Sequence, residues 1–182
     1  MTTHRTDPLL LAGKVLTLII QGALAIGAAA LLVALPAIHL ARAGYVTGIV
    51  HTNGVPIENI PIVALSGLLL VALALVVSLF VFFGKLRAII DTVGDGDPFI
   101  PDNADRLNQM AWLLLGVQLL ALPVTALAAR VAAAAGKLDE VKLSLADGSF
   151  SLNGVLVVLL LFILARVFRQ GAALREDLEG AV

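Results

Sequence analysis

The polar segment GDGDPFIPDNADRL, residues 94–107, holds the residues of this chain that are best suited to binding a cation. Its four aspartates are Asp95, Asp97, Asp102 and Asp105. Carboxylate oxygens are the ligands that calcium and magnesium prefer. A helix–loop–helix calcium site, however, needs a D-x-[DN]-x-[DN]-G pattern with a glutamate at its twelfth position, and this segment has neither. A magnesium ion held between two carboxylates is a second alternative, which no pattern here specifies.

A structural interpretation accounts for more residues of the same segment. Gly94 and Gly96 are expected to end the preceding helix. Asp102 or Asn103 is expected to cap a helix that begins at Ala104. The apolar pair in the middle should turn in against the neighbouring helix ends: Phe99 and Ile100. The segment is therefore predicted to be a corner between two helices.

Other chemistry is sparse in this sequence. There is no cysteine. Two of the three histidines, His39 and His51, are expected near the outer surface, but without a nearby pair of carboxylates they form no metal or catalytic motif. Gln21 and Gln118 are the only large polar residues in the middle of apolar segments. Each is expected to form a hydrogen bond between helices, with a substrate contact as the alternative. We therefore expect no enzymatic activity, no cofactor and no metal.

The composition indicates a membrane protein. Hydrophobic residues make up 60% of the 182 positions, charged residues 14%, and the mean hydropathy is +1.03. Soluble domains have about 45–50% apolar and about 25% charged residues. The net charge of −1 predicts no direct binding to nucleic acid. The lipid bilayer is the expected environment.

Four apolar segments are long enough to cross that bilayer, since about 20 residues suffice. The predicted spans are about 14–41, 60–84, 108–130 and 150–168, with outer loops 42–59 and 131–149, a cytoplasmic loop 85–107 and a cytoplasmic tail 169–182. The first span is too long for a signal-peptide core, so we expect it to stay as an anchor. Eight of the 12 Lys and Arg residues lie on the side of the termini. The positive-inside rule then predicts that both termini are cytoplasmic.

Turn residues in the two outer loops predict short β-hairpins. In VKLSLADGSFSL, residues 141–152, apolar and polar residues alternate around an Asp-Gly turn. In YVTGIVHTNGVPI, residues 45–57, an Asn-Gly pair lies between β-branched residues. The predicted fold is therefore an all-α transmembrane four-helix bundle of two helical hairpins, with a β-hairpin in each extracytoplasmic loop.

The two helical hairpins resemble each other. ALPAIHLA, residues 34–41, aligns with ALPVTALA, residues 121–128, and each lies near the outer end of a span. This match could reflect a duplication of one helical hairpin, or it could arise by chance in a chain rich in Ala and Leu. Both explanations are open. Small residues at helical spacing in the first span, such as Ala23, Gly27 and Ala30, suit close packing of helices within one chain or in a homo-oligomer.

Two segments resemble a known family of bacterial membrane proteins, the domain of unknown function 2975. The corner carries its Gly-x-Pro-Phe run followed by Asn and Arg-Leu, and the tail VFRQGAALREDLEGAV carries its Phe-x-x-Gly and Leu-x-Glu pattern. The matching residues are Gly96, Pro98, Phe99, Asn103, Arg106, Leu107, Phe168, Gly171, Leu174, Glu176, Asp177 and Leu178. The LEGAV ending replaces the family's usual LTV.

The resemblance implies a class of protein, in the inner membrane of a bacterium, and no established activity. Members are often encoded near small helix-turn-helix regulators, so it implies a membrane-bound partner of a cytosolic regulatory protein. In that case the corner and the tail are the candidate interaction residues. A small transporter or channel that acts as an oligomer is the alternative, and the tail as a simple interfacial helix end is the plainer interpretation of residues 166–182.

Overall fold

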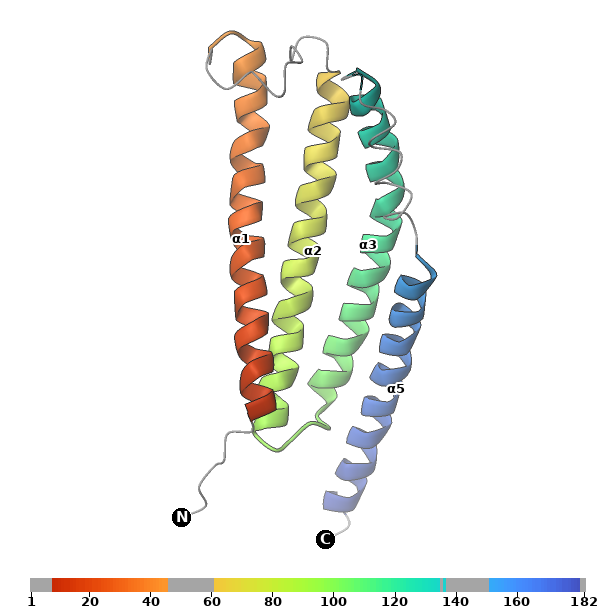
Figure 1. Cartoon of the computed structure of the whole chain (residues 1–182). Helices are drawn as coiled ribbons and strands as arrows, with labels where there is room; N and C mark the ends of the chain where they lie inside the picture. Colours follow the sequence, from red (N-terminus) through yellow and green to blue (C-terminus); the bar gives the residue numbers. More distant parts are fainter. Residues whose placement is uncertain (1–7, 46–60, 135, 137–150, 181–182) are drawn as a thin grey trace. The chain divides into compact units, whose positions relative to one another are not determined.

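The computed structural model describes residues 8–45, 61–134, 136 and 151–180, and all its regular elements are helices. These are α1 (Pro8–Arg42), α2 (Ile62–Gly94), α3 (Pro101–Ala134) and α5 (Leu152–Gly180) (Figure 1). Each of the four is long and apolar enough to cross a membrane. The predicted all-α membrane fold is confirmed at this level, and the chain is a multi-pass membrane protein.

The outward-facing surface of the helices explains why they need a bilayer. Large apolar residues are exposed along all four helices. In α1, Ile19 is 64% and Val33 is 68% exposed, and in α5, Leu160 is 60% exposed. A soluble protein rarely exposes so much contiguous apolar surface, whereas lipid solvates it at no cost. The helices also hydrogen-bond their own backbones, as every membrane-spanning segment must.

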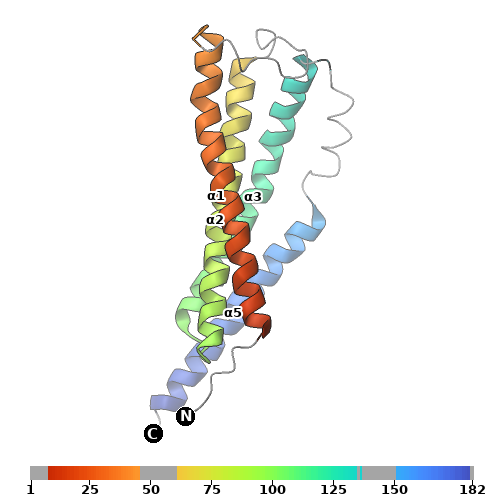
Figure 2. The ribbon, with the colours of Figure 1, turned by 60° about the vertical axis from the view of Figure 1, so that its left-hand side comes forward.

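The chain divides into two compact units that the four helices share. The four-helix unit comprises Met1–Leu24, Ser78–Gly116 and Leu152–Val182, and the three-helix unit comprises Ala25–Val77 and Val117–Ser151. The corner and the tail both belong to the four-helix unit. Figure 2 shows α5 running obliquely past the other helix segments of this unit.

The core of the four-helix unit is made by α2, α3 and α5. Its buried members are Ile89, Leu107, Met110, Ala111, Leu161 and Ala165, with five partly buried residues around them: Phe82, Leu86, Leu114, Phe162 and Phe168. The first part of α1 packs on the last part of α2, where Gly13 approaches Ile90 and Lys14 pairs with Asp91 at 2.7 Å. Gln21 donates a hydrogen bond to the Phe80 carbonyl at 3.4 Å, so the predicted interhelical bond is confirmed there.

The three-helix unit is held by small residues of α2 and α3. Ala64 and Ala132 are buried, and a Cβ built on Gly67 would lie 3.3 Å from a methyl group of Leu127. Gln118 donates to the carbonyl of Ser151, the residue before α5, at 3.3 Å. A Cβ added at Gly27 would meet no described atom within 4 Å, so packing within the described chain does not use this glycine.

The predicted β-hairpins are not supported. Residues 46–60 and 137–150, which hold both turns, lie outside the described residues. At the edges the prediction is wrong: Leu152, expected to end a strand opposite Leu143, is the first residue of α5. Tyr45, expected to open the first strand, donates its N–H to the Leu40 carbonyl at the end of α1. At Leu152 the helix of the adjoining apolar span takes in the residue, whereas at Tyr45 the chain turns through Gly44, with a φ of +82°, after α1 ends at Arg42.

Helices also occupy most of the segment predicted as the loop 85–107. α2 continues to Gly94 and α3 begins at Pro101, so only residues 95–100 are not helical. The prediction that Asp102 or Asn103 caps a helix starting at Ala104 is therefore wrong. A proline fits the first position of a helix, because it needs no N–H partner there, and this moves the start of α3 back to Pro101.

Candidate functional site

The end of α2 shows how the corner is built. Gly96 has a φ of +85°, which suits glycine because it lacks a Cβ. Its N–H donates to the Val93 carbonyl, and the N–H of Asp97 donates to the Thr92 carbonyl. This pair of bonds is the Schellman motif, a common way to end a helix. The predicted role in ending the second helix is confirmed for Gly96, whereas Gly94 is the last residue of α2 itself.

Asn103 is the centre of the corner. Its side chain is fully buried, with 0% exposure. Its Nδ2 donates to Thr92 Oγ1 at 2.7 Å and to the Pro98 carbonyl at 2.9 Å, and its Oδ1 accepts from Arg106 Nη1 at 2.8 Å. One amide thus connects the end of α2, the loop and the first turns of α3.

The tail closes over this corner through an aromatic contact. The ring of Phe99 lies 5.2 Å from that of Phe168, centroid to centroid. A Cβ built on Gly171 would lie only 2.8 Å from Cδ1 of Phe99. Only glycine allows the loop to come this close to α5. The predicted inward turn of Phe99 against a helix end is confirmed. Its partners, Phe168 and Gly171, both belong to the family pattern.

Ion pairs add to the same contact. Asp97 accepts a hydrogen bond from Arg175, and Asp105 accepts one from Arg169 Nη2 at 2.9 Å. Asp102 lies 3.7 Å from Arg106 on its own helix. Three of the four aspartates that resemble cation ligands therefore face arginines, which fits the structural interpretation. Among the described residues, no group of three or more His, Asp or Glu side chains lies close enough to hold a metal ion.

Residues 94–107 and 166–178 together form what we call the loop–tail surface. Eight of the twelve candidate residues make the contacts that hold it together or lie beneath it in the core: Gly96, Pro98, Phe99, Asn103, Arg106, Leu107, Phe168 and Gly171. The other four are exposed on the last turns of α5: Leu174, Glu176, Asp177 and Leu178. The twelve residues thus divide into a packed set, in which Gly96 and Phe99 (43% exposed) still reach the surface, and an exposed set on the last turns of α5.

Sequence reasoning missed two of the contacts that hold this surface together. Thr92 is one, because a lone threonine near a helix end carries no pattern that singles it out. The other is the pairing of Asp97 with Arg175, which joins positions 78 residues apart. Opposite charges in the corner and in the tail were visible, but only the fold shows which of them meet.

A charge exchange tests the Asp97–Arg175 pair. Arg175→Asp should raise hydrogen exchange at the backbone of residues 172–178, because two like charges then face each other. The change in unfolding free energy should stay below about 1 kcal/mol, as for other exposed pairs. The double variant Asp97→Arg with Arg175→Asp should restore slow exchange, as measured by mass spectrometry. Fast exchange in the double variant would show that the pair does not hold the tail.

The comparisons with known proteins agree with the sequence patterns in this surface. The family model described as "Protein of unknown function (DUF2975)" matches residues 27–182, which include both the corner and the tail. Neither curated proteins nor solved structures give a significant match. The match spans most of the chain, and the predicted resemblance is confirmed: the chain belongs to the DUF2975 family.

Proposed function

We propose that the protein is a non-enzymatic membrane anchor whose loop–tail surface binds a cytosolic regulatory protein. The loop–tail surface then faces the cytoplasm, on the inner membrane of a bacterium, with both chain termini on the same side. The excess of Lys and Arg at this end of the spans supports that orientation. The helix-turn-helix class of the partner rests on the family resemblance.

The observation that carries the proposal is the division of the family-pattern residues into two sets. The packed set, centred on Asn103 and Gly171, fixes the loop against α5. The exposed set does not contribute to the core: Leu174 is 65% and Leu178 72% exposed. One turn of helix separates the two leucines, so both lie on the same face of α5. Apolar residues on a fixed helix face, with charges beside them, suit an amphipathic contact with another protein.

The face of α5 that carries Leu174 and Leu178 gives the test of this proposal. A photo-reactive amino acid placed at Leu178 in the full chain should cross-link a DNA-binding protein in native membranes, identified by mass spectrometry. Leu174→Ser should reduce that product at least about tenfold, as expected for the loss of one buried anchor residue. Unfolding should not change, because Leu174 is exposed.

Leu152 is the control position for Leu178, because it is a similarly exposed leucine (79%) at the other end of α5. The same photo-reactive group there should give no such product. Equal cross-linking from both positions, or no DNA-binding protein from either, would count against the docking proposal.

The contacts of Gln21 and Gln118 support the transporter alternative less well than a packing role. A transporter calls for a polar path through Gln21 and Gln118. Each side-chain amide instead donates to a backbone carbonyl, Gln21 to Phe80 and Gln118 to Ser151. Such bonds join helix segments and are worth about 1 kcal/mol each. They favour a packing role for both residues.

A further inference from the structure

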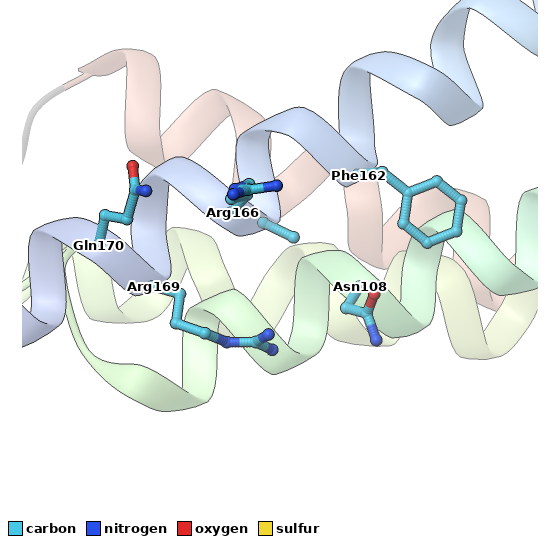
Figure 3. Close-up of a pocket in the computed structure, with 6 residues that line it drawn as sticks. Asn108, Phe162, Arg166, Arg169 and Gln170 are labelled. Carbon is cyan, nitrogen blue, oxygen red and sulfur yellow. The ribbon is translucent and has the colours of Figure 1, made fainter.

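A pocket of about 350 Å³ opens on the four-helix unit, between α3 and α5. It is lined by Asn108, Phe162, Ala165, Arg166, Arg169 and Gln170 (Figure 3). Phe162 and Ala165 join the pocket to the core, and Arg166, Arg169 and Gln170 belong to the loop–tail surface, but the docking residues Leu174 and Leu178 do not line it. We propose that this pocket binds the phosphate group of an anionic phospholipid, a function that goes beyond the docking role of the tail.

The charge of the lining favours an anion. Two of the six residues are arginines, and none is acidic. Arg166 is exposed and forms no ion pair with any carboxylate of the described residues. Its guanidinium group has five N–H donors in a planar arrangement that matches two phosphate oxygens. The pocket therefore presents a charge and a geometry that phosphate satisfies.

Arg169 and two amides complete the polar side. Arg169 reaches across to α3, where Nη2 contacts Asp105 at 2.9 Å, and this holds the side chain in place (Figure 3). That contact uses part of the guanidinium group and offsets part of its charge, so Arg166 is expected to contribute more to phosphate binding. Asn108 and Gln170 add neutral donors at the rim.

The position of the pocket along α5 identifies a lipid as the source of the phosphate. Arg166 is the first charged residue after the uncharged run 148–165, so it lies where the apolar part of the helix ends. One turn deeper, Phe162 lines the pocket and packs edge-on against Trp112 at 5.5 Å between ring centroids. Trp112 is 60% exposed, and tryptophan is typical of the membrane–water interface. A phospholipid can contact the arginines with its headgroup and the two rings with its acyl chains.

Trp112 also makes the proposal measurable, because it is the only tryptophan in the chain. The full-length protein is reconstituted in phosphatidylcholine vesicles that contain increasing fractions of brominated phosphatidylglycerol or brominated phosphatidylcholine. Bromine quenches Trp112 on contact. The anionic lipid should quench at a lower fraction than the neutral lipid does. Arg166→Gln should reduce this preference about fivefold, the effect expected for one basic residue near an anionic surface.

Two further variants separate the pocket from general surface charge. Arg166→Lys keeps the charge but loses the planar donors that match two phosphate oxygens, so it should retain only part of the preference. Arg87→Gln removes the same charge from the same unit, at a residue that does not line the pocket, and should leave the preference unchanged. An equal loss in Arg87→Gln and Arg166→Gln would overturn the proposal, and so would equal quenching of the native protein by both lipids.

Inorganic phosphate distinguishes the two sources of the anion. Adding it to vesicles that contain brominated phosphatidylglycerol should leave the quenching unchanged if the pocket holds a lipid. If inorganic phosphate removes the preference at constant ionic strength, the pocket takes a free anion and the lipid proposal is wrong.

Discussion

Replacing Asn103 by leucine is expected to lower the free energy of unfolding by about 2 kcal/mol, because the half-buried Pro98 carbonyl loses its side-chain donor and Arg106 loses its nearest acceptor. Leucine has a similar size, so the core loses no volume. The Pro98 carbonyl loses the Nδ2 donor at 2.9 Å, and Arg106 loses the oxygen that accepts from it at 2.8 Å. Thr92 is less affected, since its hydroxyl also donates to the Ile89 carbonyl.

The fluorescence of Trp112 during denaturation in mixed micelles measures this loss. Asn108→Leu is the matched control: the same substitution on the same helix, at a half-buried position. It should change the unfolding free energy by no more than about 0.5 kcal/mol, as surface changes usually do. If both variants unfold at the same denaturant concentration, the hydrogen bonds of Asn103 do not stabilise the corner.

Gly171→Val is the second substitution with a large expected effect, a loss of about 2 kcal/mol from overpacking. Valine places a Cβ 2.8 Å from Cδ1 and 3.2 Å from Cε1 of Phe99, so the ring must leave its position between α5 and the loop. Because Phe99 also contacts Phe168, the change should separate the loop from the tail. Thermal unfolding and hydrogen exchange at residues 95–100 measure the two effects.

A double variant identifies the clash as the cause. Phe99→Ala removes the obstructing ring, so adding it to Gly171→Val should cost less than the sum of the two single changes. Gly116→Val is the control, since a Cβ at Gly116 meets nothing within 4 Å. It should be neutral or slightly stabilising, because glycine disfavours a helix interior. Strict additivity of Phe99→Ala and Gly171→Val would show that the ring and the glycine do not interact.

Composition and apolar length were sufficient to predict four membrane-crossing helices. The reason is that a bilayer requires a long run of apolar residues whose backbone hydrogen bonds are made within the helix. Such a run can be recognised from neighbouring residues alone. The same local reading placed the helix end at Gly96, where positive φ needs glycine. It failed at Asn103, predicted as a cap, because α3 begins two residues earlier at Pro101, and the Asn103 side chain bonds to Thr92 and Pro98. The error at Leu152 arose because alternation suited a strand while the adjoining apolar run suited a helix.

The candidate site was predictable as two separate segments but not as one surface. The family patterns pointed to residues 94–107 and to the tail, yet nothing local indicated that Phe99 would pack on Gly171. Such pairing is decided by how the helices of the four-helix unit assemble. The pocket at Arg166 was also out of reach, since one arginine at the end of a span looks like any other that extends toward water.

The separation between the corner and its partners has a consequence for biogenesis. Asp97 and Arg175 are 78 positions apart, and every tail residue that holds the loop lies in the last helix. While the ribosome is still making the third helix, the loop can form its Schellman turn and the hydrogen bonds of Asn103. The Phe168 ring and the arginines of α5 that contact the loop have not yet been made. Insertion of the last span therefore completes the surface in a single late step. Only a chain whose last helix is in place can form this surface.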